Sequence, residues 1–398
     1  MTAGGWAGQQ AVVGVAETDY VRGTDELPLP MILRTCLGAL ADAGLGPEDV
    51  DGIIPPPGFT SAEEIAAHLG IEDLRYSATV HMGGASPVAA LQTAAMAVAC
   101  GVASVVLVTV GWNGYSAFRP REGVAKPRRA RDPGSYAGIT PDFYVPYGLR
   151  APAQLYSLYL TRYKELYGVP EEAAAAVALA CRRHAQLNPK ALMRGRELTL
   201  DDYLASPFVA EPLRKLDCCL ETDCAATVVV TTLERARDLP RHPIVLLGAG
   251  MEWMRQQYVD APRYEEVWGI GRRAAAKAFG RAGLGPSDVD IAQLYDINSF
   301  EVARQFEALG FCDVGEGTDF ASATGIGLDG KLPTCTDGGL LACSHIGWGG
   351  PTLKIVEAVR QLRGEAGDRQ VPGAELAIAA GAGSGAQYYN VAILGRAR

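Results

Sequence analysis

The chain has 398 residues, of which 48% are hydrophobic and 20% charged, a composition typical of a globular protein of two or three domains. Its formal net charge of −9 argues against general binding of nucleic acid or anionic lipid, because the average field repels polyanions. The nine cysteines include no CxxC pair, so we expect no metal site such as a zinc ribbon. Because no secretory signal is visible and the thiols follow no disulfide framework, we expect a cytoplasmic protein.

An amphipathic helix is predicted at 31–43, and the motif AGLGPEDVDGII begins at its last residue, Ala43. The glycine that follows can adopt the left-handed conformation that commonly ends a helix. Pro47 then begins a one-turn helix, and an apolar strand is expected after Asp51.

Residues 85–112 form an almost continuous apolar run that is long enough to suggest a membrane span. Gly101 divides this run into a first part rich in Ala and Met and a second part rich in Val and Leu. The first composition favours a helix, and the second favours a strand that is buried on both faces. We therefore expect a buried helix followed by a buried strand, and no membrane insertion.

The stretch at 113–222 differs from its surroundings. It contains the polar segment RPREGVAKPRRARD and then two helical patterns, at 153–167 and 171–186, with no counterpart in the second half of the chain. We interpret it as a loop domain inserted into the first half. A strand and helix that begin at Cys224 return the chain to the core.

A second copy of the motif, AGLGPSDVDIAQ, begins at Ala282 after another amphipathic helix, at 267–282. Over the shared AGLGPxDVD the copies differ only at Glu48 and Ser287. After each copy the same order recurs: a glycine-rich turn, a long helix and an apolar strand. This order predicts a duplicated α/β domain, with halves at 1–242 and 243–398.

A duplicated α/β unit of this length, with an insertion in the first half and a glycine-rich block near the C-terminus, resembles the thiolase superfamily. The stretch EPLRKLDCCLETDCAATVVVTTLERARDL is similar to the sterol-carrier-type branch. YVPYGLRAPAQLYSLYLTRY and LYDINSFEVARQFEALGFC resemble segments of the steroid side-chain-cleaving aldolases. The resemblance covers essentially the whole chain and implies the thiolase fold, two βαβαβ-type halves packed in five layers, α/β/α/β/α.

The resemblance places no cysteine at either of the two thiolase cysteine positions. Gly84 occupies the position of the nucleophile, in a turn before a buried helix, and Gly381 occupies that of the second cysteine. The thiolase histidine matches His345 in CSHIGWGG, and the thiolase asparagine matches Asn298 in DINSF.

Without a thiolate at position 84, no acyl-enzyme can form there, so acyl transfer loses its first step. Ser86 is close by, but nothing in the sequence supplies its hydroxyl with a base. The resemblance leaves a pocket for a thioester oxygen, which we assign to Gly84, Ser86, Gly381 and Gly383. Such a pocket stabilises a thioester enolate, and enolate formation without acyl transfer describes the retro-aldol cleavage of a β-hydroxyacyl-CoA.

The steroid side-chain-cleaving aldolases are understood to use two tyrosines in this pocket. Tyr295 matches the first, but His345 stands at the second, so their substrate cannot simply be transferred to this chain. We expect Tyr295, His345, Asn298 and Asp296 to be catalytic, and the sequence leaves open which of the first two is the base. An ordinary histidine pKa near 6.5 favours His345 at neutral pH.

Each of these residues also has a structural interpretation. Tyr295 could be a core tyrosine and His345 a buried histidine with satisfied hydrogen bonds, while Asp296 and Asn298 could cap or brace the turn. Cys218 and Cys219, like Cys224, have no metal-like spacing and are expected to be buried as small apolar side chains.

Basic residues are concentrated at 119–131 in this acidic chain. Arginine pairs well with phosphate oxygens, so this segment could bind the phosphates of CoA. A docking surface for a partner and a solvated loop are the alternatives. The arginines assigned to CoA are Arg119, Arg121, Arg128 and Arg129.

The resemblance implies a carbon–carbon lyase that cleaves the CoA thioester of a steroid or similarly bulky acyl group to a ketone or aldehyde and a short acyl-CoA, with no bound cofactor. Because the similar aldolases work with a small protein that combines a zinc ribbon and an OB-type barrel, we expect such a partner in a homodimer or heterotetramer. One alternative is a CoA-dependent acyltransferase or condensing enzyme with a relocated nucleophile, such as Cys335 or Cys343. Another is a non-catalytic acyl-CoA or lipid-binding subunit.

Overall fold

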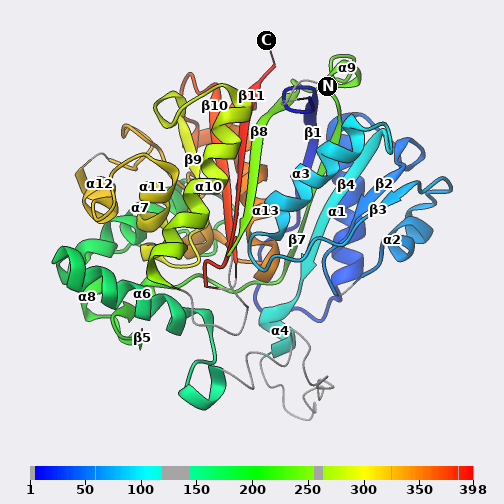
Figure 1. The fold of residues 1–398 in the computed structure, drawn as a ribbon. Helices are drawn as coiled ribbons and strands as arrows, with labels where there is room; N and C mark the ends of the chain where they lie inside the picture. The colour runs from blue at the N-terminus through cyan, green and yellow to red at the C-terminus, as the bar shows by residue number, and fades with distance from the viewer. Residues whose placement is uncertain are drawn as a thin grey trace.

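The computed structural model describes residues 5–58, 60–118, 144–254, 263–323, 325–383 and 385–397. Its main feature is a nine-stranded sheet with the order β3-β2-β4-β7-β1-β8-β11-β10-β9 (Figure 1). The strands from the first half are β1 (Gln10–Glu17), β2 (Gly52–Ile54), β3 (Tyr76–Ser77), β4 (Val105–Trp112) and β7 (Cys224–Thr232). Those from the second half are β8 (Ile244–Trp253), β9 (Ile291–Gln293), β10 (Leu376–Gly383) and β11 (Tyr388–Arg396).

The two halves of the sheet share one topology. In the first half β1 and β7, then β7 and β4, pair antiparallel, and β4 pairs parallel with β2. In the second half β8, β11, β10 and β9 repeat the same sequence of pairings. The halves meet where β1 pairs antiparallel with β8 through Ala11 and Val12. This repetition supports the duplication, and we propose the boundary between the halves near residue 242, between β7 and β8.

The repeated motif has the same structure in both copies. The helices before it end at Gly44 and Gly283, whose φ angles of 71° and 67° lie in the left-handed region that favours glycine. A one-turn helix and then β2 or β9 follow in each half. The elements are α1 (Pro28–Ala43) with η1 (Pro47–Asp49), and α10 (Tyr264–Ala282) with η6 (Pro286–Asp288).

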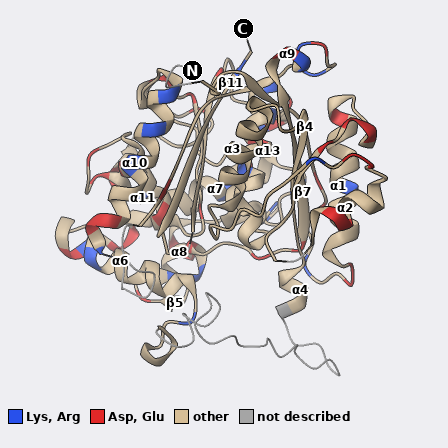
Figure 2. Ribbon diagram, turned by 45° about the vertical axis from the view of Figure 1, so that its right-hand side comes forward, with Lys and Arg blue, Asp and Glu red and all other residues tan. Residues whose placement is uncertain are grey.

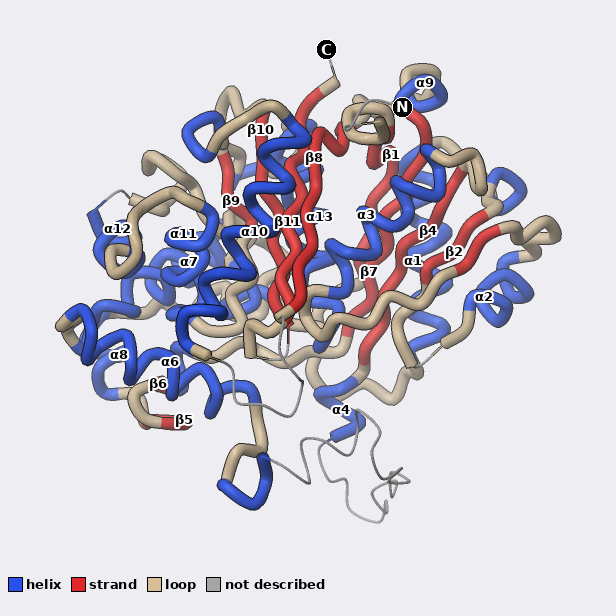
Figure 3. Tube along the Cα trace, in the orientation of Figure 1, coloured by secondary structure: helices blue, strands red, loops and turns tan. Residues whose placement is uncertain are grey.

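Five layers result from this arrangement. Helices α3 (Ser86–Ala99) and α13 (Gly350–Arg363) lie between the two half-sheets and contact strands of both (Figure 1). On the outer faces, α1 covers the first half, next to α2 (Ala62–Leu69), and α10 covers the second, next to α11 (Ser299–Leu309) (Figure 3). The expected α/β/α/β/α packing of the thiolase fold is therefore confirmed.

The apolar run at 85–112 forms α3 and β4, as predicted. A helix between two sheets is covered on all sides, so it needs no polar face. Accordingly α3 carries no charged residue, whereas charged residues are frequent on outer helices such as α10 (Figure 2). Within the described ranges, no helix has both the length and the apolar character needed to cross a membrane.

The insertion between β4 and β7 packs against the second half, where its helix α7 (Ala175–Leu187) contacts α11 and the π-helical turn Gly339–Cys343. Both predicted helices are present, although residues 171–174 form a 3-10 turn. Its described elements are α4 (Gly114–Phe118), α6 (Pro152–Tyr167), α7 (Ala175–Leu187), α8 (Leu200–Ala205), and the hairpin of β5 (Phe208–Ala210) and β6 (Leu213–Arg214). Two short helices elsewhere are α9 (Leu233–Ala236) and α12 (Gly317–Ala323).

Candidate active site

A cavity of about 430 Å³ lies where the insertion meets the two halves. This volume is within the range of small-molecule sites. The structure brings four of the predicted site residues to its wall: Gly84, Tyr295, Asn298 and His345. The other lining residues include His81, Trp112, Arg150, Tyr156, Cys218, Cys219, Glu221 and Trp348.

The Tyr295 side chain fills the space that a side chain at position 84 would need. A Cβ at Gly84 would overlap the Tyr295 hydroxyl and would lie only 2.5 Å from Tyr295 Cζ and from Ala382 O. Gly84 therefore does more than remove a nucleophile, because it makes room for the phenol. Burial raises the pKa of Tyr295 well above its usual value of 10, and the neighbouring Cys219 adds to the rise. The phenol is thus protonated at neutral pH and can donate a hydrogen bond.

His345 presents a neutral imidazole to the cavity. The side chain is buried, and neither ring nitrogen has a hydrogen-bond partner among the described residues. Burial, followed by the positive charge of Lys354, lowers the pKa of His345 to about 4. The expectation of an ordinary histidine pKa was therefore wrong. A neutral imidazole can donate an N–H to a developing oxyanion, but it is a weaker base than the sequence suggested.

Asn298 is the N-cap of α11, where its Oδ1 accepts a hydrogen bond of 2.7 Å from Glu301 N. Asn298 therefore caps the helix, as its structural interpretation proposed, and the capping hydrogen bond orients its side chain. Because the cap uses the oxygen, the Nδ2 group is the end of the amide that can donate to a ligand in the cavity.

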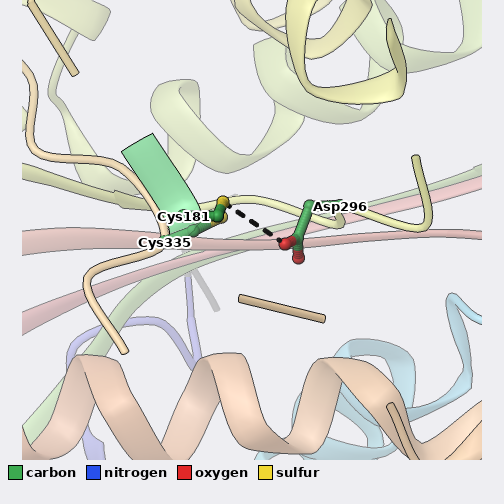
Figure 4. Close-up of side chains that lie close together, drawn as sticks. All are labelled: Cys181, Asp296 and Cys335. Atoms are coloured by element: carbon green, nitrogen blue, oxygen red, sulfur yellow. Dashed lines mark hydrogen bonds between the residues drawn. The ribbon is translucent and has the colours of Figure 1, made fainter. Parts of the chain in front are cut away.

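Asp296 does not line the cavity, and we correct its expected catalytic role to a structural one. Its Oδ1 lies 2.6 Å from Lys354 Nζ, with both side chains fully buried. Its Oδ2 accepts from Leu341 N at 3.2 Å and from Cys181 Sγ at 3.7 Å (Figure 4). Cys181, Asp296 and Cys335 could together hold a metal ion by their spacing. However, the Lys354 ammonium already neutralises this carboxylate, so we expect no metal there.

Three residues assigned to the thioester pocket lie behind its wall. Ser86 Oγ donates to the backbone of the preceding turn at 2.7 Å and accepts from Met82 N at 2.8 Å, so its hydroxyl closes this turn. Gly381 and Gly383 belong to β10, which passes against the same turn. A Cβ at Gly383 would overlap Met82 O, and one at Gly381 would lie 3.0 Å from a backbone oxygen of the turn. These three residues shape the turn that carries Gly84, and we correct their role accordingly.

The segment Cys218–Thr222 joins the loops of the site, a role that sequence reasoning missed. Cys219 N donates to Ile297 O at 3.1 Å, next to the asparagine cap. His345 N donates to Leu220 O at 2.9 Å, and Thr222 N donates to His345 O at 3.0 Å. These bonds hold the two loops at a fixed distance. The only sequence signal was the concentration of polar residues directly before β7.

Cys218 and Cys219 are partly exposed and line the cavity, contrary to the expectation that they are buried, whereas the burial predicted for Cys224 is confirmed. Burial, followed by the nearby charge of Asp217, raises the pKa of the Cys218 thiol to about 12. Burial also raises the pKa of Cys219 well above its usual value. Thiols with raised pKa values are poor nucleophiles, so neither cysteine is suited to form an acyl-enzyme.

The proposed relocated nucleophiles, Cys335 and Cys343, are fully buried and do not line the cavity. The arginines assigned to CoA, Arg119, Arg121, Arg128 and Arg129, lie outside the described residues, and their role stays a prediction. Arg150, which follows that segment, is exposed and lines the cavity.

Known proteins share this architecture. A family described as "Thiolase C-terminal domain-like" matches residues 266–396. The chain is 39% identical to 17-hydroxy-3-oxo-4-pregnene-20-carboxyl-CoA lyase of Mycobacterium tuberculosis, over 90% of this chain and 92% of that protein. It is 36% identical to the steroid side-chain-cleaving aldolase of Thermomonospora curvata, over 94% of this chain and 96% of that protein.

A solved structure described as an Ltp2-ChsH2(DUF35) aldolase matches with a TM-score of 0.88 and 33% identity, over 99% of each chain. Sequence and structure thus agree over almost the whole length, and these more similar relatives are lyases. A lower identity of 30%, over 92% of this chain and 94% of that protein, relates the chain to an acetyl-CoA acetyltransferase of Methanothermobacter thermautotrophicus. The chain belongs to the thiolase-fold carbon–carbon lyases, the family of the steroid side-chain-cleaving aldolases.

Proposed function

We propose that this protein cleaves the Cα–Cβ bond of a β-hydroxyacyl-CoA with a steroid or similarly bulky acyl group, and releases a ketone or aldehyde and a shorter acyl-CoA. The observation that carries this proposal is the Tyr295 hydroxyl in the space beside Gly84. The names of the two relatives, a pregnene-carboxyl-CoA lyase and a steroid aldolase, support the class of substrate. CoA enters as part of the substrate, and no bound cofactor is needed.

The reaction moves one proton from oxygen to carbon. The β-hydroxyl loses its proton, its oxygen forms a C=O bond, and the Cα–Cβ bond breaks. The electron pair of that bond forms the thioester enolate, which is then protonated at Cα. We assign the enolate oxygen to the N–H of neutral His345 and the Nδ2 of Asn298, since donors aimed at developing charge lower the barrier. Gly84 precedes the N-terminus of α3, and that end of a helix also favours negative charge.

Tyr295 is suited to relay the proton. A phenol with a raised pKa is a poor base when a full phenolate is needed. It can, however, accept the β-hydroxyl proton while it gives its own proton to Cα, and it is then never ionised. We therefore assign proton transfer to Tyr295 and oxyanion binding to His345.

The pH dependence tests this division of roles. Because the His345 pKa is about 4, we expect the rate to show no acid limb from this residue near the ordinary value of about 6.5. Stability should fall as the pH drops from about 6.5 towards 4, because the unfolded chain then binds a proton that folded His345 does not. The measurement is a pH–rate profile of the wild type and of His345→Gln. An acid limb near pH 6.5 that disappears in the variant would show that His345 acts as an unshifted base.

Replacement of the cavity cysteines separates the lyase from the acyltransferase. We expect Cys218→Ala/Cys219→Ala to keep most of the wild-type turnover, because neither thiol forms a bond to the substrate. Iodoacetamide can inactivate the wild type only because the group that it attaches to a cavity cysteine obstructs the substrate. The double variant should therefore resist iodoacetamide. Loss of turnover in the double variant, with an intact fold, would instead support a cysteine nucleophile.

The relative described as Ltp2-ChsH2(DUF35) supports a partner subunit. We propose that the partner of this chain is a small zinc-ribbon and OB-barrel protein, in an assembly built on a homodimer or heterotetramer in the cytoplasm. The chain expressed alone should then be poorly soluble or weakly active, and co-expression should restore both properties. Full activity of the chain by itself, measured against the co-expressed complex, would make the partner dispensable.

A further inference from the structure

We infer that Gln305 is a positioning residue that sets the rate of the reaction by holding Tyr295 in place. This inference rests on the proposed function, because it assumes that the Tyr295 hydroxyl takes part in the reaction.

The side-chain amide of Gln305 binds both backbone groups of Tyr295. Its Oε1 accepts from Tyr295 N at 3.1 Å, and its Nε2 donates to Tyr295 O at 2.8 Å. A neighbouring strand would satisfy these groups in a sheet, but Tyr295 lies beyond the end of β9, and the amide takes the place of that strand. Gln305 is fully buried, so water cannot replace the two bonds.

The helix that carries Gln305 is itself fixed. Arg304 Nε donates to Glu301 Oε2 at 2.7 Å, and both side chains of this ion pair are fully buried. Arg304 Nη1 also donates to Val267 O of α10 at 2.7 Å. The amide of Gln305 therefore cannot follow Tyr295 if the loop shifts, and the loop must keep the position that the amide dictates.

The hydroxyl of Tyr295 has little freedom at its other end. The space beside Gly84 is bounded by Ala382 O, which is a backbone atom and cannot rotate away. A small shift of Tyr295 would either push its hydroxyl against this backbone or withdraw the hydroxyl from the space beside Gly84. Misplacement of a reacting group by about 1 Å can cost about 10²-fold in rate, so loss of the amide should affect catalysis far more than binding.

The test is Gln305→Met, which keeps the size of the side chain and removes both hydrogen bonds to Tyr295, together with the bond of Nε2 to Glu301 O at 3.1 Å within the same helix. We expect kcat to fall about 10- to 100-fold with little change in KM. In the Tyr295→Phe background the same substitution should cause no further loss, because Gln305 acts through the missing hydroxyl. A purely structural role would lower the rate by a similar factor in both backgrounds and would overturn the inference.

A matched control is Gln361→Met in α13. Gln361 is also buried and holds backbone in the same way: its Nε2 donates to Arg369 O at 2.8 Å and its Oε1 accepts from Val371 N at 2.9 Å. Unlike Tyr295, the two residues that it holds do not line the cavity. The Gln361→Met substitution should lower the melting temperature and leave kcat unchanged. An equal loss of kcat in the control would show that any broken clamp slows the enzyme, and would overturn the inference.

If Gln305→Met does not fold, Gln305→Glu serves instead. A protonated buried carboxyl offers the same donor and acceptor as the amide, whereas the ionised form offers acceptors only. We expect kcat of this variant to fall with rising pH, and the fall to be absent in the Tyr295→Phe background. The same fall in both backgrounds would contradict the inference. A full rate in Tyr295→Phe alone would instead contradict the proposed function, so the two failures are distinguishable.

Discussion

Tyr295→Phe is expected to lower kcat by about 10²-fold or more, the usual scale for the loss of a general acid or base. The substitution removes only the hydroxyl that fills the space beside Gly84, so the fold should be nearly unaffected. Turnover of a β-hydroxyacyl-CoA, measured together with the melting temperature, checks both parts of this expectation.

Tyr163→Phe is a matched control for the loss of a buried hydroxyl. Tyr163 is fully buried, and its hydroxyl donates to Glu307 Oε1 at 2.6 Å, away from the cavity lining. This variant should lose stability and keep its turnover. His345→Ala should lose at least as much activity as Tyr295→Phe, and the double variant should be little worse than the poorer single variant. Wild-type rates in both single variants would mean that this cavity is not the active site.

Gly84→Ala should be at least as damaging as Tyr295→Phe, although it adds only a methyl group. The new Cβ would overlap the Tyr295 hydroxyl and would lie 2.5 Å from Ala382 O, a backbone atom. Either the tyrosine or the turn before α3 must then move, and we expect a loss of about 10²-fold or more in kcat. Tyr295→Phe should not rescue it, because the ring carbon Cζ also lies 2.5 Å from the new atom.

For the same reason Gly84→Cys should not restore a thiolase, since the sulfur would need the space of the phenol. Gly280→Ala in α10 is the control, because its Cβ would meet no atom within 4 Å and alanine favours a helix. It should leave activity unchanged and raise stability slightly. An active Gly84→Ala enzyme would contradict the position of Tyr295 in the working site.

The fold could be predicted because its strongest signals are local. The two AGLGP copies contain a helix end, a glycine with positive φ and a proline that opens a turn, and each of these follows from a few neighbouring residues. The buried character of α3 was visible from its composition alone. Positions assigned from the resemblance, such as Gly84 and His345, line the cavity. Their placement could be predicted because the predicted fold is correct.

The misassigned roles depend on contacts between distant parts of the chain. The sequence placed Asp296 among the catalytic residues, but in the structure its carboxylate is neutralised by an ion pair with Lys354 on α13. Burial of the site, followed by the charge of the same lysine, lowers the pKa of His345, and no sequence pattern reveals either effect. The clamp of Gln305 on Tyr295 was also invisible, because a glutamine within a helix has many possible partners.

The most direct test of the central claim, cleavage without a covalent acyl-enzyme, uses a β-hydroxyacyl-CoA in D₂O with no free CoA added. We predict equal amounts of ketone or aldehyde and of a shorter acyl-CoA that carries one new deuterium at Cα, while the intact protein mass stays unchanged. A reaction that requires free CoA, or that leaves an acyl adduct on a cysteine, would contradict the account.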